Sequence, residues 1–140
     1  MYFTQLVVFL YQLTNEHNSM KINAILIDPT HQIVEAIEMD NSLKGFYAAI
    51  HCELIASYGS LLNGDVATGD DAALLNGPSP LFWFGKYPLP LAGRVVITSV
   101  DDEGDCISTQ STVNDIRALI RFVPKNQNEA LFMQFHAHLC

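Results

Sequence analysis

Three residues at the end of the chain have the types and the spacing of metal ligands. His136, His138 and Cys140 alternate along the sequence, and alternate residues of a β-strand share one face. Zinc binds imidazole and thiolate groups in tetrahedral sites, and Cys52, Cys106 or an acidic residue could be the fourth ligand. On a helix this spacing would separate the three side chains, and chain ends are often mobile. We therefore expect no metal site and keep these residues only as weak candidates.

A second pattern is similar to the first half of a calcium-binding loop. Asp101, Glu103 and Asp105 alternate as the ligands of such a loop do. The sixth position is Cys106, where the loop needs glycine, and the twelfth is Thr112, where it needs glutamate. The match fails, and the acidic run predicts a solvated hairpin turn.

No catalytic pattern stands out in the sequence. Gly85 and Gly93 are eight residues apart and lack the Gly-Lys-Ser/Thr ending of a phosphate-binding loop. His51 and Cys52 are neighbours, but adjacent residues on a helix point about 100° apart, which makes a poor base and nucleophile pair. We interpret Cys52 as a small buried hydrophobic residue. The sequence therefore predicts no catalytic residues and no cofactor, and it favours a non-enzymatic protein, with an enzyme of unknown class as the last alternative.

An aromatic segment is the best candidate for a binding surface. On a strand, Phe82 and Phe84 would face one side and Trp83 the other, so that one set should enter the core. The other set could contact a partner, because aromatic residues dominate contact hot spots. Alternatively, the protein itself or a second copy covers both faces. The candidate ligand- or partner-binding residues are Trp83, Tyr87, Pro88, Pro90 and Arg94.

Composition indicates one compact acidic domain. The chain has 140 residues, of which 49% are hydrophobic and 16% are charged, which favours one compact domain over a disordered chain. The net charge of −8 arises from 15 acidic and only 7 basic residues. Few, scattered basic residues argue against nucleic-acid binding. An acidic surface could engage a basic partner or mimic nucleic acid, or it could simply be solvated.

The partners and the location follow from the same features. We expect a protein partner or self-association, and no membrane, because no apolar run approaches the roughly 20 residues of a membrane span. The chain has 3 cysteines without close spacing, which do not predict a disulfide framework. We therefore expect a cytoplasmic protein.

Turn residues and hydrophobic periodicity predict an α+β fold. We expect a small single domain in which a mixed or mostly antiparallel sheet of about five or six strands carries two or three helices. Leu43, Phe46, Tyr47 and Ile50 form the buried stripe of the first helix. The second helix is predicted to begin at the N-cap Thr112 with a capping box and to bury Val113, Ile116, Leu119 and Ile120. The predicted strands are 21–27, 32–39, 53–58, 65–68, 81–84, 95–100 and 106–108.

Three segments are expected along the chain. Residues 20–124 form the core domain, and residues 125–140 form a C-terminal segment that we predict to be helical. Residues 1–19 precede a natural strand start at Met20. They are either an extension outside the core or a short helix packed on it.

The order of these features is similar to that of a known family. The apolar stretch 24–29 with its Asp-Pro end, a helix that ends at Cys52 and is followed by Glu-Leu-Ile, and Gly-Lys-Tyr-Pro-Leu-Pro-Leu-Ala-Gly-Arg at 85–94 resemble domain of unknown function 3846. The resemblance covers roughly residues 20–123. His51 departs from it, because a glycine would be expected there.

The resemblance indicates in which genomes such a protein occurs, but it does not indicate a reaction. Proteins of this family are uncharacterised and are carried by bacteria, phages and mobile elements, and the resemblance implies no catalytic residue. We therefore expect a non-enzymatic binding protein of phage, prophage or plasmid origin, with a host-modulating or anti-defence role. The alternative is a domain that binds a nucleotide or metabolite, with a pocket between the first helix and residues 85–94.

Overall fold

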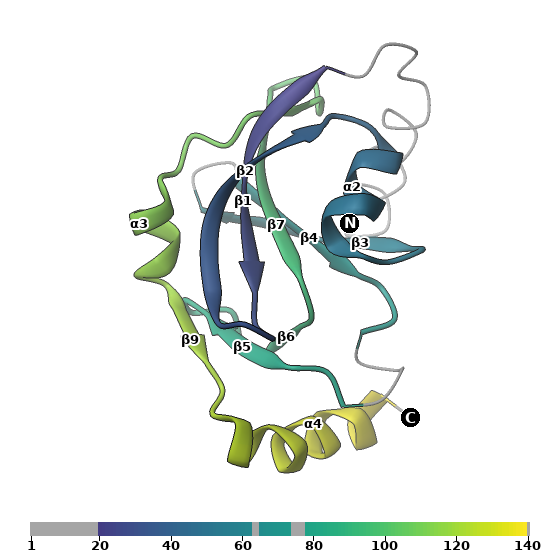
Figure 1. The fold of residues 1–140 in the computed structure, drawn as a ribbon, viewed down its shortest axis with the longest axis vertical. Coiled ribbons are helices and arrows are strands. Elements are labelled where there is room, and N and C mark those ends of the chain that lie inside the picture. The colour runs from purple at the N-terminus through teal and green to yellow at the C-terminus, as the bar shows by residue number, and fades with distance from the viewer. Residues whose placement is uncertain (1–19, 63–64, 74–77, 140) are drawn as a thin grey trace.

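The computed structural model describes residues 20–62, 65–73 and 78–139, and the predicted N-terminal extension lies outside them. The described residues form a six-stranded sheet and a three-stranded sheet, both antiparallel, with three helices (Figure 1). The predicted α+β class is therefore confirmed. The large sheet contains β1 (Lys21–Asp28), β2 (Ile33–Asp40), β3 (Ile55–Leu62), β4 (Asp65–Asp70), β7 (Val95–Val100) and β8 (Cys106–Ile107). The small sheet contains β5 (Leu81–Phe84), β6 (Leu91–Ala92) and β9 (Ile120–Phe122). The helices are α2 (Leu43–Ile50), α3 (Val113–Arg117) and α4 (Lys125–Leu139).

The large sheet has the order β2-β1-β7-β4-β3, and β8 also pairs with β7. Its central strands are almost continuously apolar, since both of their faces are covered. In β1, for example, every residue from Ala24 to Asp28 is buried. Side chains from the two faces of this sheet therefore pack into two separate hydrophobic cores.

Helix α2 covers one face of the large sheet. Ser42 caps this helix by accepting a hydrogen bond from the Gly45 N–H at 3.0 Å. Phe46 and Ile50 are buried against Leu26 and other residues of the sheet. The predicted apolar stripe of the first helix is thus confirmed as core.

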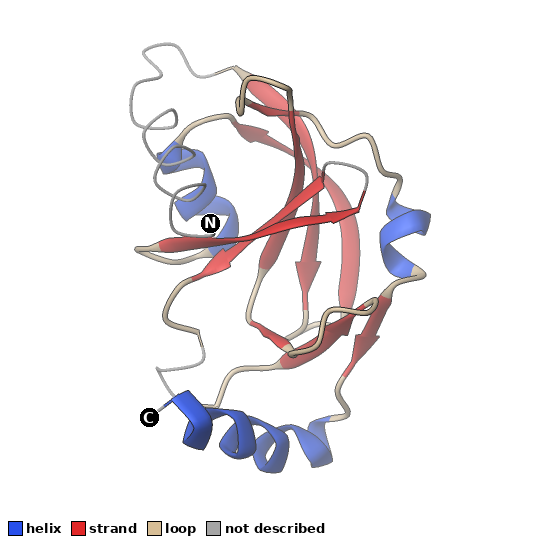
Figure 2. Cartoon of the chain, turned by 180° about the vertical axis from the view of Figure 1, so that it is seen from behind, coloured by secondary structure: helices blue, strands red, loops and turns tan. Residues whose placement is uncertain are grey.

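The small sheet and α3 cover the opposite face. Phe82, Phe84 and Leu91 pack against the large sheet, together with Ile116 from α3. On the far side of the small sheet, Phe132 of α4 is 1% exposed in a cluster with small-sheet residues. Figure 2 shows α4 beside the small sheet at one end of the molecule. The C-terminal segment is therefore packed as part of the fold.

The second helix is shorter than its periodicity predicts. Thr112 and Asp115 form the predicted capping box, but α3 ends at Arg117. Ile120 instead begins β9 and pairs with Phe84 of β5. The prediction that Ile120 lies on this helix is wrong, because strand pairing with a distant segment outweighs local helical periodicity.

Residues 85–94 carry the chain from one sheet to the other. The preceding strand β5 lies in the small sheet, whereas the following strand β7 lies in the large sheet. Gly85 and Gly93 have φ angles of 51° and 73°, a conformation that costs glycine little. Between them, β6 pairs back onto β5. The two glycines therefore mark the ends of a crossover.

Candidate functional site

The predicted aromatic residues do not form one surface. Trp83 is half-buried and its ring meets the ring of Phe135 in α4 edge-on, with centroids 6.2 Å apart. Tyr87 is also half-buried and packs edge-on against Tyr58 at 6.4 Å. Trp83 belongs to the cluster under α4, whereas Tyr87 packs against the cluster between the two sheets. Both rings therefore have packing roles, in two separate parts of the molecule.

The prolines of this loop differ in exposure. Pro88 and Leu89 are exposed, and Leu89 keeps 48% of its surface accessible. Pro90 is buried at the start of β6. The exposed part of the predicted site is thus a small apolar tip.

Arg94 lies beside Asp28, the last residue of β1, which also contacts His31 in the turn that follows. Its Nη1 lies 3.3 Å from Oδ2 of Asp28, and Nδ1 of His31 lies 2.7 Å from the same oxygen. The other carboxylate oxygen, Oδ1, accepts the N–H groups of Thr30 and His31 at 3.1 and 3.4 Å. We call Asp28, His31 and Arg94 the Asp28 cluster. It lies where β1 ends and β7 begins.

Arg94 also bridges to α2. Its Nε donates to the carbonyl oxygen of Ala49 at 3.0 Å. This bond crosses the place where a small-molecule pocket was predicted, between the first helix and residues 85–94. The Arg94 side chain therefore fastens three elements of the fold to one another.

The hydrogen-bond partners of Asp28 stabilise its ionised form. Burial raises the pKa of Asp28, but hydrogen bonds from His31 and the positive charge of Arg94 outweigh this effect, so that its pKa lies below its ordinary value. His31 is largely exposed, with 70% of its side chain accessible. Within the described residues, however, no hydrogen bond joins His31 to a hydroxyl or thiol group. The cluster has the Asp–His pair of a general base, without a nucleophile among the described residues hydrogen-bonded to the histidine.

Replacing Asp28 with asparagine should remove a pH-dependent part of the stability. Because the folded-state pKa is lowered, the carboxylate stabilises the fold above its unfolded pKa of about 4 and loses this effect as the pH falls through the folded pKa. The difference in unfolding free energy between wild type and Asp28→Asn should therefore be largest near neutral pH and shrink in acid. Urea denaturation across this range measures it. The exposed control Glu53→Gln should show a smaller pH dependence, and equal behaviour of both variants would contradict the cluster.

Neither described cysteine is suited to nucleophilic chemistry. Burial is the main cause that raises the pKa of Cys52 and that of Cys106 to about 11. Both thiols are therefore protonated at neutral pH. Cys52 packs against the core under α2 as a hydrophobic residue would, but it is half-buried and not fully buried as predicted.

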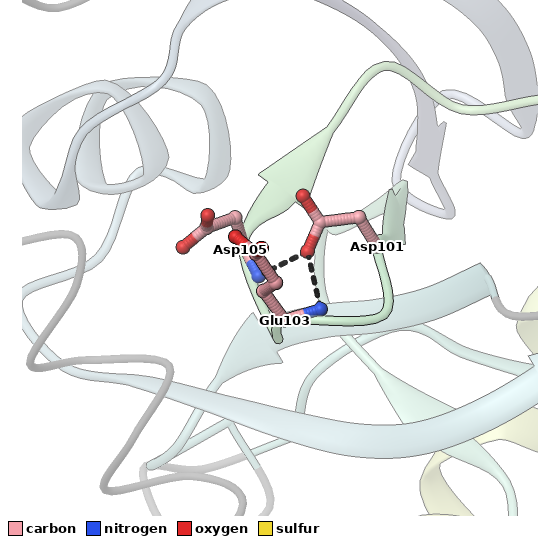
Figure 3. Close-up of side chains that lie close together, drawn as sticks. All are labelled: Asp101, Glu103 and Asp105. Atoms are coloured by element: carbon pink, nitrogen blue, oxygen red, sulfur yellow. Dashed lines mark hydrogen bonds between the residues drawn. The ribbon is translucent and has the colours of Figure 1, made fainter.

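The two metal candidates have different outcomes. Carboxylate oxygens of Asp101, Glu103 and Asp105 lie within 4.8 Å of one another. Figure 3 shows the reason: Oδ1 of Asp101 accepts the N–H groups of Glu103 and Asp105 at 3.0 and 2.8 Å. Backbone N–H groups of the turn therefore orient the Asp101 carboxylate, and the turn connects the paired strands β7 and β8 as a hairpin.

The strand that a C-terminal zinc site requires does not form. His136 and His138 belong to α4, and Cys140 lies outside the described residues. Residues that are two positions apart share a face on a strand, but on a helix they point in different directions. The zinc hypothesis thus loses the geometry on which it depended.

Acidic residues from two segments lie at the same end of the large sheet. Asn41, directly after β2, donates from Nδ2 to the carbonyl oxygen of Cys106 at 2.9 Å. This bond places Glu38 and Asp40, at the end of β2, on the same side as the acidic turn 101–105. Lys21 offsets part of this charge by pairing with Asp40 at 2.8 Å. We call the carboxylates of Glu38, Asp40, Asp101, Glu103 and Asp105 the acidic end.

Asp65 is a further carboxylate that sequence reasoning missed. It is 2% exposed and accepts hydrogen bonds from the hydroxyl groups of Ser99, Thr109 and Ser111. These donors belong to β7 and to the segment between β8 and α3. Because the hydroxyl groups all donate to one carboxylate, the network holds that segment on the sheet.

Comparisons with known proteins found no match among family models, curated proteins or solved structures. The resemblance to domain of unknown function 3846 therefore stays a prediction. Within the described part of the chain, the helices are too short or too polar to cross a membrane.

Proposed function

We propose that this protein is a non-enzymatic interaction module whose partner is a basic protein. The observation that carries the proposal is the acidic end of the large sheet, where the last residues of β2 and the carboxylates of the turn 101–105 lie at the same end. Glu38 and Glu103 are exposed there. Complementary charge on a partner would steer its approach and fix its orientation.

The state of the reactive groups supports a binding role. Asp28 and Arg94 are engaged with each other and with the backbone of neighbouring elements. The thiols of Cys52 and Cys106 have pKa values raised to about 11. Binding to a partner requires none of these groups to react.

The family resemblance supplies the biological setting of this proposal. A phage, prophage or plasmid protein that binds a host protein could modulate the host or counter its defences. This part rests on the resemblance at residues 85–94 and on the other quoted segments.

Selection from a random peptide library, displayed on ribosomes, tests the proposal. The immobilised protein should enrich peptides rich in lysine and arginine, and their binding should weaken as salt rises, because salt screens exposed charges. The double variant Glu38→Lys with Glu103→Lys should lose these peptides. A matched variant, Glu53→Lys with Glu129→Lys, makes the same change in net charge outside the acidic end and should keep them. Enrichment of peptides without basic residues, or equal loss in both variants, would contradict the proposal.

A bound small molecule would favour the alternative function. Native mass spectrometry of the purified protein should show the mass of the polypeptide alone. A co-purified nucleotide or metabolite at one equivalent would support a small-molecule binding domain instead.

A further inference from the structure

The outer edge of β2 carries backbone groups that no described strand pairs with. β2 is the first strand of the large sheet, and it pairs with β1. The Asn41 N–H donates to the Met20 carbonyl in the register that continues this pairing. Hydrogen-bonded and non-hydrogen-bonded pairs alternate in an antiparallel ladder, so the odd-numbered residues of β2 bond to β1. The N–H and C=O groups of Ala36 and Glu38 therefore point away from the sheet.

One hydrogen bond supports the outward direction of the even-numbered backbone groups of β2. It also occupies one of these groups, so that the unpaired part of the edge is shorter than β2. Nη2 of Arg117, at the end of α3, donates to the carbonyl oxygen of Val34 at 3.2 Å. An even-numbered carbonyl of β2 thus points outward, as the register requires. Figure 1 shows α3 beside β2. Ala36 and Glu38, further along the strand, are exposed. Free strand edges of this kind are protected by charged residues or bind an extended segment as a further strand.

The side chains along the open edge define a pattern. Glu35 and Glu38 are both exposed, and because strand residues alternate, they lie on opposite faces of the sheet. Between them, Ala36 is exposed and Ile37 is half-buried. A strand added to this edge would place one residue opposite each of these four positions. Basic residues match the outer two positions and apolar residues match the inner two.

We propose that the outer edge of β2 binds an extended basic segment of a partner protein as an added strand. The segment has the pattern basic, apolar, apolar, basic, which reads the same in either strand direction. This inference rests on the proposed function and adds the site, the mode of binding and the sequence pattern. A second copy of the chain fits poorly, because β2 has three acidic residues and no basic one, so that two copies would bring like charges together.

A short peptide with blocked ends tests the pattern. The probe is Thr-Lys-Val-Val-Lys-Thr, and its counterpart has glutamate in place of both lysines. In an NMR titration the lysine peptide should bind, and the N–H groups of Ala36 and Glu38 should gain protection from hydrogen exchange. The N–H of Ile37 should already be protected in the free protein, since it bonds to β1. The glutamate peptide should not bind.

Two variants of the edge separate this site from a general attraction of charges. Ala36→Pro removes an outward N–H without removing a bond to β1, and proline is tolerated on edge strands. It should weaken binding of the lysine peptide about tenfold or more, the effect of losing one well-formed hydrogen bond. The matched control Ala36→Val keeps the N–H and should bind like wild type.

Modified peptides give an answer that does not depend on folding of the proline variant. The two central valines of a bound strand point their N–H groups to opposite edges. N-methylation of one valine should therefore abolish binding, and N-methylation of the other should not.

The outcomes are distinct. Equal binding of the lysine peptide to wild type and Ala36→Pro, with both methylated peptides still bound, would overturn the edge site and leave a basic partner in place. Failure of every basic peptide, including those from the random library, would overturn the proposed function as well. Dimers that protect Ala36 and Glu38 in the free protein would replace the partner strand by a second copy.

Discussion

Replacing Gly45 with alanine should destabilise this protein, although the same change stabilises an ordinary helix. A Cβ at this position would lie 2.0 Å from the carbonyl oxygen of Asp40. That oxygen cannot easily move, because it accepts the Ser42 N–H at 2.9 Å and belongs to a strand paired with β1. Alanine in a helix gains about 1 kcal/mol over glycine, whereas forcing an extra methyl group into a packed site costs about 3 kcal/mol. The cost of the steric clash should exceed the gain in helix propensity, so that the variant is less stable than wild type.

The measurement is the free energy of unfolding in urea. Ala48→Gly, at an exposed position of the same helix, reports helix propensity without a packing change and should cost about 1 kcal/mol. A Gly45→Ala variant as stable as wild type would show that α2 does not begin against the end of β2 as closely as described.

Replacing Asp65 with alanine should have an effect of similar size. The change removes the acceptor shared by Ser99, Thr109 and Ser111 and leaves a cavity beside them. A buried donor without an acceptor costs about 1–3 kcal/mol, so the loss of the whole network should cost about 3 kcal/mol or more. Asp65→Asn should cost less, because its amide oxygen remains an acceptor.

Unfolding in urea and hydrogen exchange test this together. Amide protons of residues 109–111, of which the Gln110 N–H bonds to Ser99 Oγ at 3.2 Å, should exchange faster in the alanine variant. The exposed control Asp71→Ala should change the free energy of unfolding by less than about 0.5 kcal/mol. A loss in Asp65→Ala no larger than that of this control would contradict the network.

Helix starts and glycine positions illustrate what local chemistry specifies. The capping box at Thr112 forms as predicted, because both of its hydrogen bonds join residues only three apart. Gly85 and Gly93 have the positive φ angles that glycine adopts readily. His51 shows the limit of this approach, because it has a φ of 61° at the end of α2 without being glycine.

The candidate sites depend on residues that are distant in sequence. Arg94 was among the predicted binding residues, but its partner Asp28 is 66 positions away. Trp83 was a candidate binding residue, with coverage by the protein itself or a second copy as the alternative, and only the packing of α4 shows that Phe135 lies against it. The free edge of β2 was not predicted, since a strand pattern is the same at an edge as beside a partner.

By itself, the sequence determined the α+β class, the apolar stripe of α2 and the acidic net charge. It also determined that glycines lie near both ends of the connection 85–94. These properties follow from the spacing of apolar residues, local hydrogen bonds and charge count. Only the tertiary structure decided that β5 and β7 belong to different sheets, that Ile120 lies in β9 and not in the helix, and which edge of β2 no described strand covers. The physical reason is that strand pairing is a choice among distant segments, made by the burial and backbone bonding of the whole chain.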